Sequence, residues 1–115
     1  MDDLVVERVL RAVEQVPRGR VVSYGDLAAL VGCGPRYVGS VMKVYGGNVT
    51  WWRVTNASGD LPAPLRERAR QVWAEEGILV KPNGLGCRIA DYRADLDALA
   101  AADERAVADL AEDPG

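Results

Sequence analysis

A break within a helical stretch constrains the fold of this chain more than any other feature. Apolar residues recur at helical spacing on both sides of Gly32-Cys33-Gly34, and a helix does not continue through two glycines followed by Pro35. Pro35 suits the first turn of a new helix that runs toward Lys43. Ser23, with Asp26 three residues later, suits the N-cap of the helix before the break. The pattern predicts two short helices joined by a tight turn, either a helix-turn-helix or an ordinary helical hairpin.

Further secondary structure is predicted on both sides of this pair. Helices are predicted where apolar residues recur at helical spacing, over residues 2–16, over residues 65–77 and in the tail from Tyr92 onward. Residues 78–80 and 87–89 are expected to pair as a small β-hairpin. Residues 44–64 show no helical period and are expected to form a long binding loop. We therefore expect one mainly α domain over residues 1–92, followed by an acidic, helical C-terminal tail over residues 93–115.

Charge is divided unevenly along the 115 residues. Residues 1–92 hold 12 Arg and Lys against 10 Asp and Glu, a net charge of +2, whereas residues 93–115 hold 2 against 7, a net charge of −5. The overall charge of −3 therefore does not exclude a nucleic-acid partner for the body of the chain. Three arginines at close spacing are expected to form a solvated helix face: Arg66, Arg68 and Arg70.

Several classes of protein are excluded by what the sequence lacks. The chain has no histidine, which excludes histidine-based acid-base catalysis and histidine metal ligands. Its two cysteines, Cys33 and Cys87, form neither a disulfide framework nor a zinc pattern, so we expect no metal and no cofactor. No apolar run approaches the roughly 20 residues of a membrane span, and the acidic start does not resemble a signal peptide. A cytoplasmic protein with no membrane partner is expected.

Three separated segments resemble the C-terminal, DNA-binding domain of the O6-alkylguanine-DNA alkyltransferases. They are residues 21–28 (VVSYGDLA), residues 34–43 (GPRYVGSVMK) and residues 51–54 (WWRV) with Asn56 and Gly59 behind them. Their order, spacing and residue types agree over roughly residues 1–80. The resemblance implies a winged helix-turn-helix-like fold that enters the minor groove and extrudes a base from the duplex.

The resemblance also implies roles for individual residues. Arg36 corresponds to the arginine that takes the place of the extruded base, where a planar guanidinium can stack and hydrogen-bond the orphaned partner base. Without this context, Arg36 would be interpreted as a solvated arginine at a helix start. Tyr24 is placed to push on the phosphate of the flipped nucleotide. Further phosphate contacts are implied, through side chains or backbone amides, for Pro35, Tyr37, Gly39, Ser40 and Lys43.

The chain departs from the alkyltransferases at Thr50-Trp51-Trp52-Arg53, where they have Pro-Cys-His-Arg. Without the thiol and its activating histidine, alkyl transfer by the usual route is excluded. Alkyltransferase-like proteins form a branch of this family that has tryptophan at the cysteine position and binds O6-alkylguanine without removing the alkyl group. The alternative for Trp51 is an ordinary core residue. The lesion pocket is expected to involve Met42, Trp51, Trp52, Arg53, Val54 and Pro64.

The resemblance therefore implies a non-enzymatic damage sensor that is associated with the nucleoid when bound to DNA, and a monomer is the default expectation. Its partner would be double-stranded DNA containing O6-alkylguanine, and the bound lesion would be flagged for nucleotide excision repair proteins. Three alternatives remain open. The chain could be a transferase that uses Cys33 or Cys87, a sequence-specific helix-turn-helix regulator that never flips bases, or a protein-interaction module that uses its acidic tail.

Overall fold

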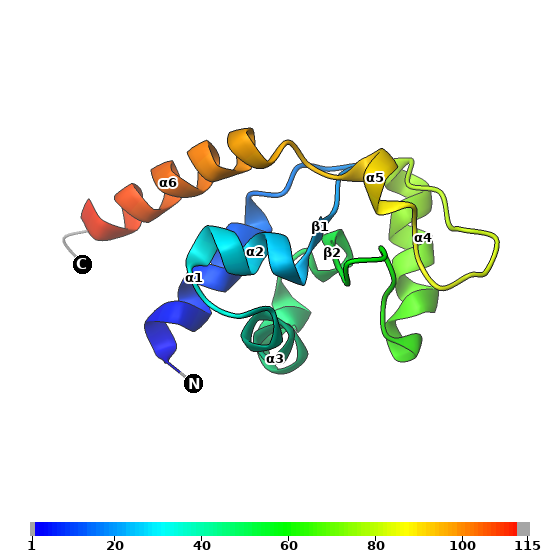
Figure 1. The fold of residues 1–115 in the computed structure, drawn as a ribbon, viewed down its shortest axis with the longest axis horizontal. Coiled ribbons are helices and arrows are strands. Elements are labelled where there is room, and N and C mark those ends of the chain that lie inside the picture. The colour runs from blue at the N-terminus through cyan, green and yellow to red at the C-terminus, as the bar shows by residue number, and fades with distance from the viewer. Residues whose placement is uncertain (1, 113–115) are drawn as a thin grey trace.

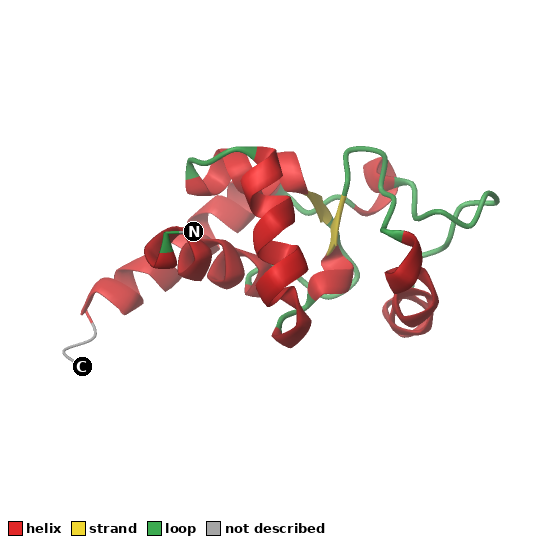
Figure 2. Cartoon of the chain, turned by 90° about the horizontal axis from the view of Figure 1, so that it is seen from below, coloured by secondary structure: helices red, strands yellow, loops and turns green. Residues whose placement is uncertain are grey.

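The computed structural model describes residues 2–112, and helices dominate it (Figures 1 and 2). The α-helices are α1 (Asp3–Glu14), α2 (Tyr24–Val31), α3 (Pro35–Tyr45), α4 (Arg66–Glu76), α5 (Ile89–Tyr92) and α6 (Leu96–Glu112). Three short 3-10 helices are η1 (Gly46–Asn48), η2 (Trp51–Arg53) and η3 (Ala63–Leu65). The expected mainly α fold is confirmed. Within residues 2–112, none of the helices combines the length and apolarity needed to cross a membrane.

The predicted break between two helices is confirmed at α2 and α3. Ser23 caps α2, because its hydroxyl accepts a hydrogen bond from the Asp26 amide at 3.1 Å while the Asp26 carboxylate accepts one from the Ser23 amide at 2.9 Å. α2 ends at Gly32, whose φ of 86° lies in the left-handed region that favours glycine. Pro35 begins α3. The two helices pack against each other and against α1.

Valine side chains fill most of the core between these three helices. Val9 and Val13 of α1, Leu27 of α2, and Val38 and Val41 of α3 are all 0% exposed. Burial of their apolar surface is the main source of stability for this part of the molecule. α3 is therefore held on a closely packed support, and in Figure 1 it lies below α2 with one side free.

The small sheet joins two segments that are distant in the sequence. β1 (Val22–Ser23) pairs in parallel with β2 (Val54–Thr55), with Val22 opposite Val54. The sequence predicted a loop over residues 44–64 and did not predict this sheet, because a strand of two residues has no detectable period. The sheet attaches that loop directly to the start of α2.

The predicted hairpin is reduced to a turn. Val80 and Cys87 form one isolated antiparallel bridge, and Ile89, which was expected in the second strand, begins α5. The Lys81 amide donates to the Gly86 carbonyl at 2.7 Å within the turn, but the Cys87 amide donates to another loop, at the Gly59 carbonyl at 2.9 Å. Tertiary contacts therefore take over part of the local strand pairing that the sequence favoured.

The helix predicted in the tail is present as α6, and its first half packs on α1. Leu99 and Asp103 of α6 are each only 4% exposed. Two backbone hydrogen bonds attach the segment before α6 to Val21, one from the Val21 amide to the Tyr92 carbonyl at 2.9 Å and one from the Ala94 amide to the Val21 carbonyl at 3.0 Å. The tail is thus packed against the helical core up to at least Asp103.

Candidate nucleic-acid interface

The free face of α3 carries most of the residues that the sequence predicts to contact DNA. Arg36, Ser40 and Lys43 are exposed and lie about one helical turn apart, whereas Val38 and Val41 are buried on the opposite face. The N-cap of α3 is glycine, so no capping side chain covers the amides of its first turn. Free amides and the positive end of the helix dipole favour an anion such as a phosphate.

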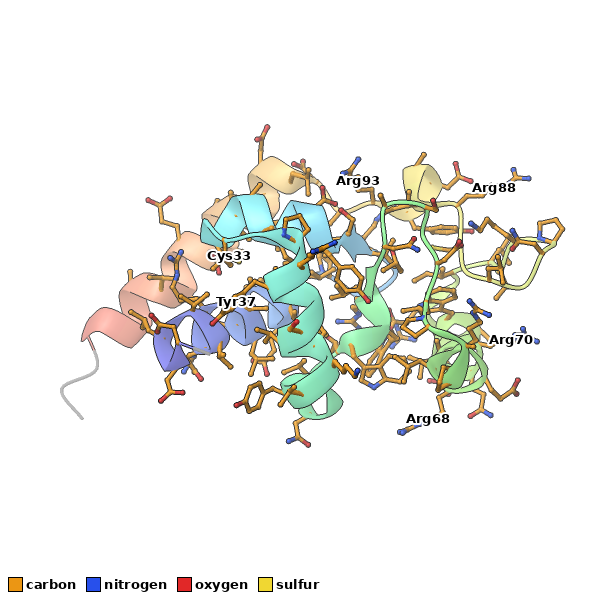
Figure 3. All side chains as sticks on the ribbon, turned by 60° about the horizontal axis from the view of Figure 1, so that its bottom comes forward. Cys33, Tyr37, Arg68, Arg70, Arg88 and Arg93 are labelled. Atoms are coloured by element: carbon orange, nitrogen blue, oxygen red, sulfur yellow. The ribbon has the colours of Figure 1, made fainter. Side chains whose placement is uncertain are left out.

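Gly39, Tyr37 and Tyr24 differ in the groups that a ligand could contact. A Cβ atom on Gly39 would meet no heavy atom within 4 Å, so this helix position is open to close approach. The Tyr37 hydroxyl accepts a hydrogen bond from the Asp2 amide at 2.9 Å, which turns this side chain toward α1 (Figure 3). Tyr24 is half-buried at the start of α2, and burial raises the pKa of its hydroxyl. Tyr24 is therefore a neutral hydrogen-bond donor at pH 7.

η2 carries the Trp-Trp-Arg motif on the side of the molecule next to α4. The Trp51 ring is half-buried and meets the Trp52 ring edge to face, with centroids 5.7 Å apart and planes at 86°. The guanidinium carbon of Arg68, from α4, lies 5.9 Å from the centroid of the Trp51 ring. The sequence placed Arg68 on a solvated face. It could not indicate this contact, because nothing in the sequence places α4 against η2.

A buried carboxylate holds η2 against the C-terminal end of α4. The Glu76 side chain is 5% exposed and accepts hydrogen bonds from Trp52 Nε1 at 2.7 Å, from Arg53 Nε and Nη2 at 3.0 and 2.9 Å, and from the Gly19 amide at 2.8 Å. Arg53 also donates to the Val16 carbonyl at 3.1 Å. Burial by itself raises the pKa of Glu76, but the bonds from Arg53, Gly19 and Trp52 outweigh it and lower the pKa below its usual value. Glu76 is therefore an ionised anchor at pH 7. Sequence analysis did not identify it.

The remaining predicted pocket residues lie on several elements. Val54 is 2% exposed in β2 and belongs to the core, while Met42 is half-buried near the end of α3 and packs against the same core. Pro64 is exposed in η3, which contacts α4. α4 also contacts η2, so the Trp51 ring and Pro64 flank the same helix. Of the predicted set, Pro64 is exposed, Trp51 is half-buried like Met42, Trp52 and Arg53, and Val54 lies beneath the surface.

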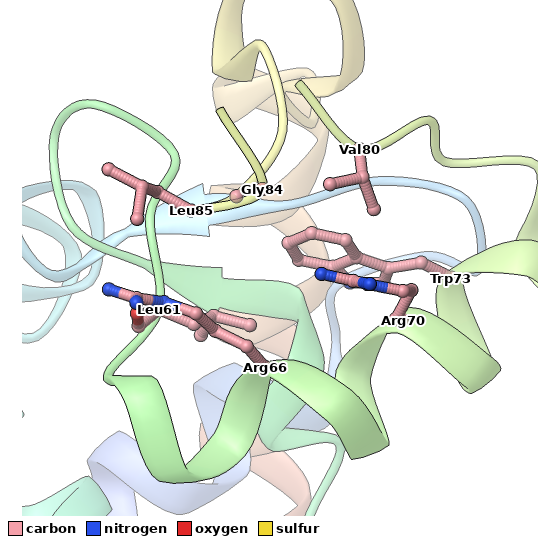
Figure 4. Close-up of a pocket in the computed structure, with 8 residues that line it drawn as sticks. Leu61, Arg66, Arg70, Trp73, Val80, Gly84 and Leu85 are labelled. Atoms are coloured by element: carbon pink, nitrogen blue, oxygen red, sulfur yellow. Dashed lines mark hydrogen bonds between the residues drawn. The ribbon is translucent and has the colours of Figure 1, made fainter. Parts of the chain in front are cut away.

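A separate hollow lies between α4 and the turn that follows it (Figure 4). Its lining residues are Leu61, Arg66, Arg70, Trp73, Val80, Gly84, Leu85 and Gly86. None of them belongs to the predicted DNA-contacting or lesion-pocket sets. Its floor is formed partly by Trp73, which is 2% exposed and donates from Nε1 to the Trp52 carbonyl at 2.7 Å. The hollow therefore lies at a packing junction and is distinct from the Trp51 site.

Neither cysteine is suited to act as a nucleophile. Cys33 lies in the α2–α3 turn (Figure 3), where burial raises the pKa of its thiol even though the nearby Arg8 lowers it. Cys87 is 0% exposed, and burial raises its pKa to about 11. A thiol with a raised pKa is almost entirely protonated at pH 7, and the protonated form is a poor nucleophile.

Comparison with known proteins agrees with this arrangement. The family model described as the DNA-binding domain of 6-O-methylguanine DNA methyltransferase matches residues 5–78. A DNA base-flipping protein of Escherichia coli (strain K12) is 37% identical over 89 residues, which cover 72% of this chain and 69% of that protein. A DNA base-flipping protein of Vibrio parahaemolyticus (serotype O3:K6, strain AQ3810) is 32% identical over 91 residues, covering 73% and 89% of the two chains.

Two solved structures have the same fold. One is S. pombe Atl1 in complex with damaged DNA containing O6-carboxymethylguanine, with a TM-score of 0.69 and 28% identity over 81% of this chain and 96% of that chain. The other is S. pombe ATL in complex with DNA, with a TM-score of 0.67 and 30% identity over the same shares. The chain therefore belongs to the family of the 6-O-methylguanine DNA methyltransferase DNA-binding domain, as an alkyltransferase-like member.

Proposed function

We propose that this protein binds duplex DNA, flips an O6-alkylguanine out of the stack and holds it beside Trp51 without removing the alkyl group. The observation that carries the proposal is the position of Trp51. Its half-buried ring lies on η2 between Trp52 and α4, where the family resemblance places the alkyl-accepting cysteine. An aromatic ring at this point offers stacking surface to a flipped base but no atom that can accept an alkyl group.

The DNA-binding part of the proposal is supported by the free face of α3. Arg36 is exposed at the start of this helix, where its guanidinium can fill the gap left by the extruded base. Lys43 and Ser40, together with the open first-turn amides, are suited to phosphate contacts. Tyr24, as a neutral donor, is suited to the phosphate of the flipped nucleotide. The relatives named for base flipping and for damaged-DNA complexes support the same role.

The absence of alkyl transfer is supported by the chemistry of the groups near the site. The motif Thr50-Trp51-Trp52-Arg53 contains neither thiol nor imidazole, and the chain contains no histidine at all. Cys33 and Cys87, the only thiols, both have raised pKa values. Because the lesion would persist after binding, we also propose that the protein–DNA complex flags it for nucleotide excision repair.

The test is direct binding to matched duplexes with and without one O6-methylguanine at fixed salt. We expect tighter binding to the lesion, with the methyl group still on the DNA afterwards. Arg36→Ala should weaken binding to both duplexes, and Trp51→Ala should reduce the preference for the lesion. Arg105→Ala, which removes an exposed helical arginine from α6, is the matched control for Arg36→Ala and should change neither affinity.

Two results would overturn the proposal. Equal affinity for the two duplexes would mean that lesion recognition is absent, and strong discrimination among undamaged sequences would then favour a helix-turn-helix regulator. Transfer of a labelled methyl group to the protein would instead identify a transferase.

A further inference from the structure

The Glu76 carboxylate uses its acceptor capacity entirely inside the molecule. Two of its partners, Trp52 and Arg53, lie on η2, and the third, the Gly19 amide, lies in the loop after α1. The side chain is 5% exposed, so it is not available to a ligand at the surface. All four donors bond to the same buried, ionised carboxylate. Only one arrangement of these groups therefore makes every hydrogen bond. Its effect on the site is therefore exerted through the residues that it holds.

We propose that Glu76 is the positioning residue of the lesion site and acts through Trp52 and Arg53 to hold η2 in the orientation that presents Trp51. This inference rests on the proposed function, since it assigns the group that orients the lesion-contacting ring. Glu76 itself touches neither the base nor the phosphates. Trp52 acts as a support and not as a lesion contact.

The bonds of Trp52 explain how the orientation is transmitted. Its single ring donor, Nε1, points to Glu76 at 2.7 Å, and its carbonyl accepts from Trp73 Nε1 at 2.7 Å. Both ends of the residue are thus attached to α4. Its ring meets the Trp51 ring at 86° with centroids 5.7 Å apart, so a change in the orientation of Trp52 alters the packing of Trp51.

Arg53 provides the second attachment from the other end of η2. Two of its nitrogens bond to Glu76, and Nη1 donates to the Val16 carbonyl at 3.1 Å beyond the end of α1. The guanidinium therefore connects α4 to the end of α1 through η2. A 3-10 helix of three residues has almost no stability of its own, so its orientation depends on such tertiary bonds.

Glu76→Gln is the informative substitution because it preserves size and shape. The amide has one oxygen instead of two and adds an NH₂ group, which faces a donor of Trp52 or Arg53. At least one partner must therefore turn away. The matched control is Glu75→Gln, which removes the same charge at the preceding, exposed position of α4.

The experiment combines binding with a signal from Trp51 itself. The full chain is labelled with 5-fluorotryptophan, and the ¹⁹F resonances of Trp51, Trp52 and Trp73 are assigned with single Trp→Phe variants. For Glu76→Gln we expect the preference for O6-methylguanine duplex to fall about tenfold, with affinity for undamaged duplex unchanged within about twofold. The Trp51 resonance should broaden or split. Glu75→Gln should resemble the wild type in all three measurements.

The outcomes separate positioning from general support of the fold. Equal weakening on both duplexes, or an unchanged lesion preference with an unchanged Trp51 resonance, would overturn the inference. If the wild type shows no lesion preference, the proposed function fails, and the Trp51 resonance in Glu76→Gln against Glu75→Gln still decides whether Glu76 orients the ring. If Glu76→Gln does not fold, Trp52→Phe replaces it, since this variant keeps an aromatic ring at the position, removes the Nε1 donor to Glu76 and shortens the ring that packs on Trp51.

Discussion

Arg93, which follows α5, is ion-paired with Asp26 in the first turn of α2, 67 positions earlier in the chain. Arg93 Nε donates to one Asp26 oxygen at 3.0 Å and Nη2 donates to the other. Asp26 is also the acidic member of the capping box that begins α2. The segment before α6 is therefore attached to the start of the helix-turn-helix by a side-chain pair as well as by the backbone bonds of Val21.

Removal of Arg93 should change the titration of Asp26. Burial alone raises the pKa of Asp26, but the bonds from Arg93 and from Ser23 outweigh it and hold the pKa below its usual value of 3.8. In Arg93→Ala the pKa of Asp26 should rise, as measured by NMR titration of its carboxyl carbon. Arg88→Ala, which removes an exposed arginine at the other end of α5, is the control. An unchanged pKa in Arg93→Ala would show that the pair does not persist in solution.

The same substitution should have a small and pH-dependent effect on stability. The Arg93 side chain is 46% exposed, so solvent screens the pair and the expected loss is about 0.5 kcal/mol. Because the pKa of Asp26 is lowered in the folded state, this contribution is present above pH 3.8 and is lost as the pH falls further. Urea unfolding of both proteins at pH 7 and at pH 2.5 should show a difference that is smaller in acid.

Glu76→Gln should destabilise the protein more than Arg93→Ala. Glu76 and Arg53 are 5% and 14% exposed, and loss of a hydrogen bond to a buried charged group costs about 2 kcal/mol. The pKa of Glu76 is lowered from its usual 4.5, so its contribution is complete at pH 7 and declines as the pH falls below 4.5. Chemical denaturation across this range should show wild type and variant converging in acid. A constant difference at every pH would contradict an ionised Glu76.

Gly39→Ala should separate stability from DNA binding. A glycine within a helix costs roughly 0.5–1 kcal/mol relative to alanine, and a Cβ atom at Gly39 meets no heavy atom within 4 Å. The variant should therefore unfold at a higher temperature. On the free face of α3, the added methyl group should obstruct the DNA backbone and weaken binding to damaged and undamaged duplexes alike. Tighter or unchanged DNA binding would remove Gly39 from the predicted interface.

Lys43 can be tested through the salt dependence of binding. Each phosphate contact releases condensed counterions, so Lys43→Ala should reduce the slope of log K against log salt by about 1 on both duplexes. Arg105→Ala on α6 should leave the slope unchanged. Parallel slopes for wild type and Lys43→Ala would indicate that this lysine does not contact a phosphate.

Gly59→Ala should be among the most damaging small substitutions in the chain. Gly59 has a φ of 84°, and a Cβ atom there would lie 2.1 Å from the Cys87 carbonyl oxygen. Left-handed strain and a backbone clash together should cost about 3 kcal/mol. Gly47→Ala is the control, because its Cβ would meet nothing within 4 Å. Equal thermal stability of the two variants would show that the contact between these loops is not required for folding.

The predictions from sequence were accurate where a signal was local. The capping box at Ser23 and Asp26, the break at Gly32 and the start of α3 at Pro35 depend on residues within a few positions of each other, so they were visible in the chain. The family motifs extended this to the fold, whereas the DNA-contacting residues that they imply stay predictions. The predicted hairpin is present only as one antiparallel bridge between Val80 and Cys87 and not as two full strands, because other backbone groups of the segment, such as the Cys87 amide, bond to a loop that the local pattern does not include.

By itself, then, the sequence determined α1 to α4, α6 and the turn between α2 and α3, and it predicted that Trp51 stands at the position of the nucleophile, since each depends on side-chain identity and short spacing. Only the tertiary structure decided what surrounds Trp51. The bonds of Glu76 to Trp52 and Arg53, and the position of Arg68 over the Trp51 ring, join segments about twenty residues apart with no common motif. Their formation depends on burial and on the packing of α4 against η2, which no spacing rule in one sequence expresses.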